Sequence, residues 1–288
     1  MIFRFRKRRA LLLTLPVLIF CCVFVLFHEV KGEGAMETVT VVTYNVGTLN
    51  GEKPSLERVV SAIGKKGAPD LLLLQEVPDE AFALRIAGKL RLPYHAFGAY
   101  SANGSGYGLA VLSSRPLVNP AMHLLKPYGH SVLTAEMRSE KNRVLVCSAH
   151  LERVRTVKQN KEGFELPWEK AFQILKTELT NETPRSHAVE EILLLLALRR
   201  SEETIIGGDF NTVPFSTAIR GMERVYSDAL WLTTDYFTGT YIKVGFFLKP
   251  RIDYIFHSVG MKVREASVIR QGAGDHYPVW AVLGAHSG

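Results

Sequence analysis

The chain has 288 residues, 47% of them hydrophobic, with 35 lysines and arginines against 28 acidic residues and only 3 cysteines. This composition excludes a disulfide-rich mini-protein and a disordered chain, and no repeat of about 20 to 50 residues is visible. One domain of ordinary size, or two small ones, remains.

The net charge of +7 is concentrated at the N-terminus. Five basic side chains lie within the first nine residues, and the rest of the chain has 30 basic against 28 acidic residues, a net charge of +2. A basic surplus spread over the surface would indicate a polyanionic partner, but the body of this protein is nearly neutral. We therefore interpret residues 1–9 as a basic flank that remains in the cytoplasm.

Residues 10–27 are uncharged and almost entirely apolar. As a helix they would span about 27 Å, close to the ~30 Å hydrocarbon core of a bilayer. The basic flank before them predicts a signal anchor, a single transmembrane helix with everything after residue 27 outside the cytoplasm. A cleaved signal peptide is the alternative. The small residues that cleavage would need, Gly32 and Gly34, lie among charged residues, so we favour the anchor, followed by a linker at residues 28–37.

From residue 38 onward, buried strands alternate with amphipathic helices, which predicts one α/β domain over residues 38–285 with a large sheet area. Helices are expected at residues 54–66, 79–90 and 186–200. Strands are expected at residues 38–44, 70–75, 94–99, 108–113, 131–137, 143–149, 204–207, 252–257, 261–269 and 278–283.

Polar side chains stand where several of these apolar runs stop, and strand ends are where α/β folds build their sites. They are Asn45, Glu76, His150, Asp209, Asn211, Asp253, Asp275 and His276. Each alone has an ordinary structural interpretation: Asp209 could make an Asx turn, for example, and Asp253 could pair with Arg251. Their order along the chain carries more information than any single residue.

Six segments, in chain order, resemble the endonuclease/exonuclease/phosphatase superfamily, which includes deoxyribonuclease I, apurinic endonucleases, neutral sphingomyelinases and inositol polyphosphate 5-phosphatases. The segments are Thr43–Val46, Leu74–Val77, Ser148–Leu151, Gly207–Thr212, Arg251–Phe256 and Gly274–Val279. The Gly-Asp-Phe-Asn run after a strand and the Asp-His-x-Pro run near the C-terminus are the specific pair. The resemblance implies a four-layer α/β sandwich of two packed mixed β-sheets flanked by helices.

The resemblance also implies a phosphoester hydrolase that uses Mg²⁺ or Mn²⁺, and a phosphodiesterase above all. Glu76 would ligate the metal, since hard oxygen ligands suit Mg²⁺. Asn45 and Asp275 would support that site directly or through water. The remaining roles fall to Asp209, which would activate the water; Asn211, which would hold the phosphate; His276, paired with Asp253, which would stabilise the transition state; and His150, which would contact a phosphate oxygen or assist the leaving group.

The substrate stays open between nucleic acid, sphingomyelin or another phospholipid, phosphoinositides and small phosphate esters. A His at position 150 differs from the Tyr of apurinic endonucleases and disfavours abasic-site repair. The nearly neutral body disfavours tight duplex binding, because phosphate contacts normally recruit Lys or Arg. The catalytic domain is expected to be monomeric. A catalytically silent interaction module on the same fold is the alternative, but such a module has no chemical reason to keep all these residues.

Two segments are candidates for substrate choice. Residues 152–183 form a long polar insertion after His150, which would be either a lip over the site or an extra helix. Such a helix would pack on the domain through Phe164, Trp168, Phe172, Ile174 and Leu175. Residues 245–249 would be either an apolar tip that touches lipid or the end of a buried strand.

Overall fold

The computed structural model describes residues 38–47, 54–100, 107–125, 130–138, 143–154, 168–199, 201, 203–242 and 249–284. The basic flank at 1–9, the span at 10–27 and the linker at 28–37 lie outside the described residues, as does most of the apolar segment at 245–249. Within the described ranges, none of the helices is long and apolar enough to cross a membrane. The unit that carries the described elements extends over Glu37–Gly288.

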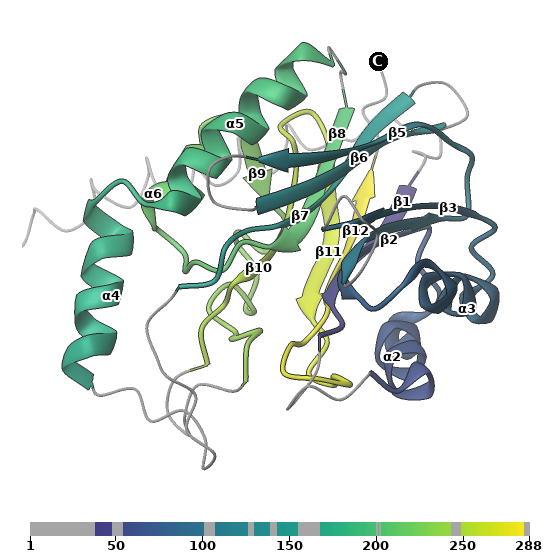
Figure 1. Ribbon diagram of the computed structural model, residues 1–288, viewed down its shortest axis with the longest axis horizontal. Helices are drawn as coiled ribbons and strands as arrows, with labels where there is room; N and C mark the ends of the chain where they lie inside the picture. The colour runs from purple at the N-terminus through teal and green to yellow at the C-terminus, as the bar shows by residue number, and fades with distance from the viewer. Residues whose placement is uncertain are drawn as a thin grey trace, which may run out of the picture. The chain divides into compact units, whose positions relative to one another are not determined.

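Two six-stranded sheets form the centre of this unit (Figure 1). Sheet A has the order β11 (Lys262–Val268), β12 (Val279–Gly284), β1 (Thr38–Asn45), β2 (Leu71–Val77), β4 (Gly108–Ser113) and β3 (Tyr94–Ala99). Sheet B has the order β5 (Leu117–Leu125), β6 (His130–Arg138), β7 (Arg143–His150), β8 (Glu203–Asp209), β10 (Asp253–Ser258) and β9 (Tyr226–Asp228). Both sheets are mixed, because β1 pairs with β2 and β7 with β8 in parallel, whereas the other neighbours are antiparallel.

Three buried apolar clusters fill the spaces between four layers. The central cluster lies between the sheets and includes Val41, Leu73, Val146 and Ile255. A second cluster joins the outer face of sheet A to α2 (Leu56–Ile63) and α3 (Glu80–Leu90), and a third joins the outer face of sheet B to α5 (Pro184–Leu198) and α6 (Thr217–Glu223). The predicted α/β sandwich of two packed mixed sheets flanked by helices is confirmed.

Helix starts follow capping side chains. Helix α2 begins after Ser55, whose hydroxyl accepts the Arg58 N–H, so Pro54 precedes the helix that was expected to begin there. The end of that expected helix, Gly64–Lys66, is a 3₁₀ turn. Helix α5 begins two residues earlier than expected, because Thr183 forms a capping box with Ser186.

Three short or irregular elements escaped the sequence pattern: β5, β9 and α6. Strand β5 contains Pro120 and a bulge at Asn119, features that an edge strand tolerates. The insertion at 152–183 does contain an extra helix, α4 (Trp168–Thr180), but two of the side chains expected to pack it on the domain are exposed, Phe172 at 62% and Leu175 at 41%. Phe164 lies outside the described residues.

Candidate active site

Alternation along the strands brings most of the predicted residues to one place. On β1, Val39 and Val41 face sheet B, so Asn45, at the same parity, faces it too. The same alternation along β7, β8 and β10 directs the side chains of His150, Asp209 and Asp253 toward sheet A. In that sheet His150 pairs with Asp209, and Asp209 pairs with Asp253, so the three lie in one row across β7, β8 and β10.

Asp209 is the hub of the site. Its Oδ2 accepts a hydrogen bond from Asn45 Nδ2 at 3.0 Å and lies 3.7 Å from Nε2 of both His150 and His276. Its Oδ1 accepts the backbone N–H of Asn211 at 2.8 Å, so the Asx turn and the functional position coexist. Burial, followed by the neighbouring carboxylate of Asp253, raises the pKa of Asp209 to about 7, despite the opposing effect of His276. A carboxylate with such a pKa is suited to general-base work.

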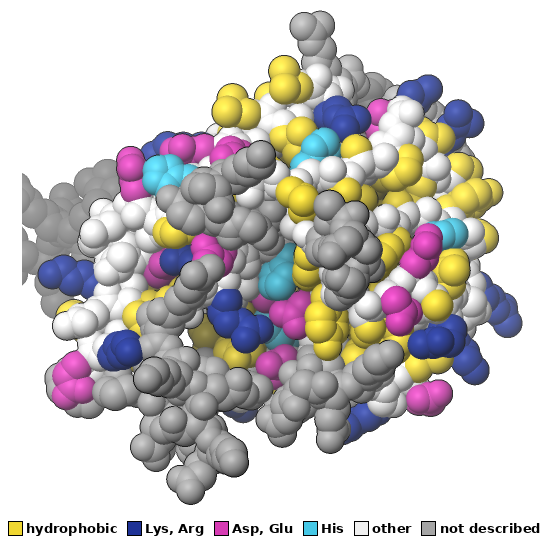
Figure 2. Space-filling model, viewed as in Figure 1, with side chains coloured by type: hydrophobic (Ala, Val, Ile, Leu, Met, Phe, Trp, Pro, Cys, Tyr) yellow, Lys and Arg dark blue, Asp and Glu magenta, His cyan; other side chains and the backbone are white. Residues whose placement is uncertain are grey.

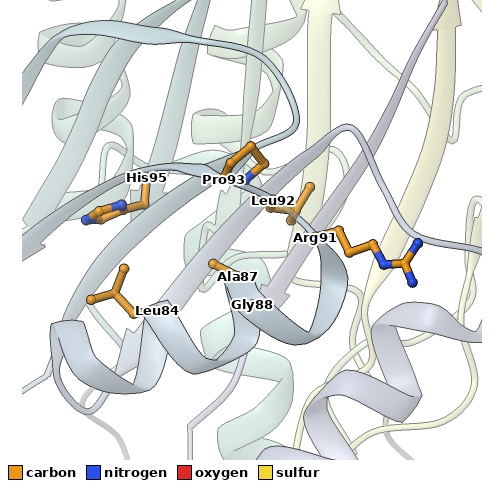
Figure 3. A pocket seen from close by; sticks show the side chains of 7 residues that line it. All are labelled: Leu84, Ala87, Gly88, Arg91, Leu92, Pro93 and His95. Carbon is orange, nitrogen blue, oxygen red and sulfur yellow. The ribbon is translucent and has the colours of Figure 1, made fainter.

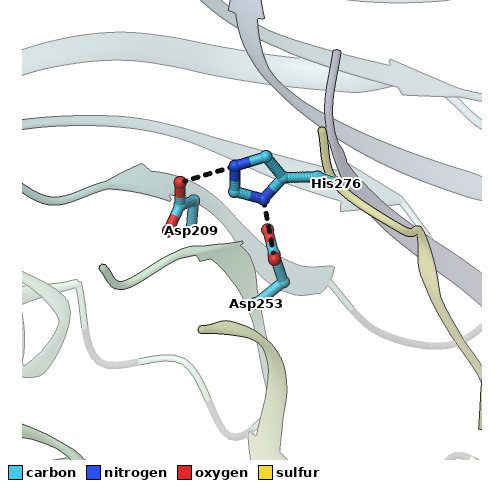
Figure 4. Close-up of side chains that lie close together, drawn as sticks. All are labelled: Asp209, Asp253 and His276. Carbon is cyan, nitrogen blue, oxygen red and sulfur yellow. Dashed lines mark hydrogen bonds and ion pairs between the residues drawn. The ribbon is translucent and has the colours of Figure 1, made fainter. Parts of the chain in front are cut away.

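His276 is held between two carboxylates (Figure 4). Its Nδ1 hydrogen-bonds Asp253 Oδ2 at 2.9 Å, while Nε2 faces Asp209. Burial alone would lower the pKa of His276, but the charges of Asp253 and Asp209 and the hydrogen bond to Asp253 outweigh it and raise the pKa to about 10. The ring is therefore an imidazolium at neutral pH. Asp253 does not pair with Arg251, which forms its ion pair with Asp228 at 2.7 Å.

His150 has a different partner. Its Nδ1 lies 2.8 Å from the hydroxyl of Tyr100, and its Nε2 lies 3.7 Å from Glu76 Oε1. Burial lowers the pKa of His150 to about 4, and the charges of His276 and Arg153 act in the same direction, against Glu76. The ring is neutral at physiological pH. Tyr100 keeps its proton, because burial raises its pKa well above the ordinary value.

Glu76 reaches the site through a distortion of β2. Leu72 and Leu74 face the helices, so strict alternation would direct residue 76 to the same side. The pairing of β2 with β4 shifts register between Leu74 and Val77, and Glu76 has a φ of 53°. This bulge turns the carboxylate toward Asn45, whose Nδ2 donates to Glu76 Oε1 at 3.3 Å.

The geometry around Glu76 suits a hard divalent cation. A Cβ at Gly47 would lie 2.1 Å from Glu76 Oε2, so only glycine leaves this place open. The Glu76 side chain is 20% exposed, which lets water complete a coordination shell. Asn45 presents its amide nitrogen to the two carboxylates and accepts the Gly47 N–H with Oδ1, so in this arrangement it orients Glu76. Asp275 is the second carboxylate that we consider for this metal site.

Asp275 and Glu76 lie on the same side of the domain. After burial, Asp275 is the largest contributor to the raised pKa of Tyr241, about 12, and Asp209 and Glu76 act on the same hydroxyl. Tyr241 pairs with His276 in an isolated β-bridge, and their rings are 4.9 Å apart. Asn211, with a φ of 49°, donates its side-chain amide to Leu151 O at 2.9 Å, which joins the loops after β7 and β8.

A second grouping of potential metal ligands overlaps the first. Ligand atoms of Asp209, Asp253 and His276 lie within 4.8 Å of one another. Both nitrogens of His276 face carboxylates, and an imidazolium has no lone pair to give a metal. We therefore interpret Asp209 and Asp253 as carboxylates that keep His276 protonated, and we regard Glu76 as the better metal ligand.

Sequence reasoning missed Tyr100, Tyr241, Arg153 and Gly47. Arg153 extends its Nη2 to within 3.4 Å of Glu76 Oε1 and is 64% exposed. These residues stand in loops or just beyond strands, where no periodicity marks them. Only the glycine two residues after Asn45 carried a usable signal, because a conformation or contact that excludes a side chain calls for glycine.

The site opens to solvent on one face of the domain. Figure 2 shows histidine and acidic side chains together in a hollow near the middle of that face, with basic side chains at its edge. A separate pocket of about 460 Å³ lies between α3 and β3 (Figure 3). Its lining is Leu84, Ala87, Gly88, Arg91, Leu92, Pro93 and His95, which includes none of the predicted site residues.

Solved structures share this fold at low sequence identity. An endonuclease/exonuclease/phosphatase from Bacteroides vulgatus has a TM-score of 0.65 at 15% identity, with 86% of this chain and 99% of that one covered. D. rerio TDP2 complexed with a single-strand DNA product has a TM-score of 0.61 at 14% identity, covering 86% and 100%. The human Nocturnin catalytic domain with bound sulfate has a TM-score of 0.62 at 19% identity, covering 86% and 93%.

No curated protein sequence matches this chain significantly. The model of the Endonuclease/Exonuclease/phosphatase family matches residues 42–276, which include all eight predicted site residues. The match covers most of the chain, and its strand-end residues meet in one site. The chain therefore belongs to the endonuclease/exonuclease/phosphatase family.

Proposed function

We propose that this chain is a metal-dependent phosphoester hydrolase, above all a phosphodiesterase, in which Asp209 activates water. The observation that carries the proposal is the arrangement around Asp209: a buried carboxylate with a raised pKa, flanked by one charged and one neutral imidazole, with Glu76 beside them. A water hydrogen-bonded to Asp209 loses its proton to the carboxylate as its oxygen bonds to phosphorus. The bond from phosphorus to the ester oxygen breaks at the same time, and that oxygen leaves as an alcohol after it takes up a proton.

The two imidazoles supply different help. The His276 imidazolium, oriented by Asp253, stabilises negative charge that develops on the phosphoryl oxygens. His150 donates from Nε2 to another oxygen, either non-bridging or leaving. Asn211 retains a second amide hydrogen for the phosphate. A divalent ion at Glu76 and Asp275, Mg²⁺ or Mn²⁺, would supply Lewis-acid stabilisation of the phosphate charge.

The charge of the site favours a diester. His276 Nε2 lies 3.7 Å from Asp209 Oδ2, and Arg153 Nη2 lies 3.4 Å from Glu76 Oε1, so two cations stand beside carboxylates of the site. A diester carries one negative charge at neutral pH and a monoester nearly two, so the diester asks for less positive charge than a monoester does beside the four carboxylates of this site. The DNA product bound to TDP2 makes nucleic acid one candidate substrate, and phospholipid headgroups remain another.

The location of the enzyme is a further part of the proposal. The basic flank at 1–9 and the apolar run at 10–27 support a single-pass anchor with the catalytic domain outside the cytoplasm. Protease treatment of intact cells should then digest the domain but leave the flank protected. Full protection of the domain would contradict this topology.

A substrate panel tests the activity. We expect Mg²⁺- or Mn²⁺-dependent hydrolysis of at least one of plasmid DNA, RNA, sphingomyelin, phosphoinositides and bis(4-nitrophenyl) phosphate, abolished by EDTA. Hydrolysis that persists unchanged in EDTA would contradict the metal assignment. Absence of hydrolysis of every member, with either metal, would support a catalytically silent module instead.

A further inference from the structure

Tyr100 follows the last residue of β3 and places its hydroxyl between two site residues. The hydroxyl oxygen accepts the backbone N–H of Glu76 at 3.1 Å and lies 2.8 Å from His150 Nδ1. The rings of Tyr100 and His150 are 5.5 Å apart and tilted by 45°. One hydroxyl therefore contacts both the backbone of Glu76 and the ring of His150.

The available donors indicate which group donates in the hydrogen bond between the Tyr100 hydroxyl and His150 Nδ1. A backbone N–H can only donate, so the Tyr100 oxygen serves Glu76 as an acceptor. The hydroxyl proton is then available to His150 Nδ1, and a neutral imidazole that accepts at Nδ1 carries its own proton on Nε2. That Nε2 lies 3.7 Å from both Glu76 Oε1 and Asp209 Oδ2, on the side where substrate would bind.

We propose that Tyr100 is a positioning residue that fixes the Nε2–H tautomer of His150, so that this imidazole donates a hydrogen bond to a substrate oxygen. The proposal adds a positioning residue to the proposed phosphoester hydrolase. It rests on that proposed function for the identity of the substrate oxygen. The tautomer itself is a property of the free enzyme.

Replacement of the hydroxyl isolates its effect. In Tyr100→Phe the ring remains, but Nδ1 of His150 loses its donor, and the Nδ1–H tautomer becomes populated. We expect kcat to fall about 10- to 100-fold, the usual cost of losing a group that orients a functional histidine. Tyr107→Phe is the matched control, because Tyr107 lies close in sequence and is 36% exposed. It should retain the wild-type rate.

Two readouts separate positioning from general damage. The ¹⁵N shifts of His150 in the full chain, assigned by their loss in His150→Gln, should report an unprotonated Nδ1 and a protonated Nε2 in the wild type, and averaging between tautomers in Tyr100→Phe. A double-mutant cycle should show that Tyr100→Phe changes kcat less than about twofold when His150 is already Gln.

Three outcomes would overturn the proposal: a protonated Nδ1 in neutral wild-type His150, an unchanged tautomer in Tyr100→Phe, or an equal loss of kcat in both backgrounds, which would mean that Tyr100 acts through Glu76. The NMR measurement needs no substrate. If the wild type hydrolyses no phosphoester, the proposed function fails, while the shifts still decide whether Tyr100 fixes the tautomer.

Discussion

Two imidazoles flank Asp209, and they differ in charge although their positions are similar. His150 and His276 are both largely buried, and each places Nε2 at 3.7 Å from Asp209 Oδ2. Yet the pKa of His150 is lowered to about 4 and that of His276 is raised to about 10. The difference lies at Nδ1, which meets the Tyr100 hydroxyl in one ring and the Asp253 carboxylate in the other.

The two rings differ in charge because of their neighbours, since burial lowers the pKa of both. Burial lowers the pKa of both rings, but a hydrogen-bonded carboxylate more than compensates at His276. The site thereby gains one cation to stabilise charge and one neutral donor. Some of the following changes act on this difference directly, and others act on the parts of the site around the two imidazoles.

Removing the carboxylate partner of His276 should have the largest effect. Asp253→Asn preserves the side-chain shape but removes the charge, so the pKa of His276 should fall toward or below its ordinary value. We expect kcat to fall about 100-fold or more, because the cation is lost. Steady-state kinetics and ¹⁵N titration of His276 check this result. Glu265→Gln, a surface change at an exposed ion pair with Lys66, serves as control. Wild-type kcat with an unchanged His276 pKa would contradict the account.

A buried ion pair supports the loops on the His150 side. Glu178 accepts from Arg185 and from Thr212 Oγ1, and Arg185 Nη1 donates to Glu152 O at 3.2 Å. Glu178→Gln leaves Arg185 buried without its counter-charge, so we expect a loss of about 3 kcal/mol in unfolding free energy.

Urea unfolding measures that loss, with Glu182→Gln as the matched control. Glu182 is 77% exposed and lies 3.9 Å from His187 Nε2, so its replacement should cost less than about 0.5 kcal/mol. Similar losses in the two variants would show that the Glu178–Arg185 pair does not hold these loops.

Opposite pKa shifts predict opposite pH dependences of stability in metal-free protein. The lowered pKa of His150 contributes stability that is present above its unfolded pKa of 6.5 and is lost as the pH falls toward 4. The raised pKa of His276 contributes stability that is present below 6.5 and is lost as the pH rises toward 10. Relative to wild type, His150→Gln should flatten the acid side and His276→Asn the alkaline side. Urea unfolding in EDTA from pH 4 to 10 measures both slopes, and identical slopes in all three proteins would contradict the opposite charges.

The smallest expected effect concerns the proposed metal site at Glu76 and Asp275, which is next to both imidazoles. Gly47→Ala would place a Cβ where Glu76 Oε2 lies and push the carboxylate aside. We expect Mg²⁺ affinity to fall about tenfold, equivalent to about 1.4 kcal/mol, with little change in the His276 pKa. Calorimetric titration with Mg²⁺ checks this. Gly64→Ala is the control, because no neighbouring atom lies within 4 Å of its added Cβ.

Strand ends and the order of the motifs, rather than alternation, identified the site residues in the sequence. In the structure, strand parity carries Asn45, His150, Asp209 and Asp253 to the inner faces of the two sheets and brings them together. The same rule fails for Glu76, because a bulge and a positive φ reverse its direction. Its place at a strand end and the motif resemblance identified Glu76, but neither predicted the bulge that turns its side chain inward.

Contacts from outside the strands were beyond the sequence pattern. Tyr100 follows β3, at the edge of sheet A, and reaches His150 of sheet B only because the two sheets pack together. A single tyrosine beyond a strand carries no periodic signal. Likewise, the insertion at 152–183 predicted an extra helix but gave no indication that its Glu178 would join Arg185 and Thr212.

The most direct test of the central claim is the Mg²⁺-dependent hydrolysis of bis(4-nitrophenyl) phosphate by the wild type and by Asp209→Asn, with Mg²⁺ binding measured in both proteins. We predict that Asp209→Asn binds Mg²⁺ but loses activity by about 10³-fold, because the group that accepts the proton from water is gone. Equal activity in the two proteins would contradict the role of Asp209 and, with it, the account of the site.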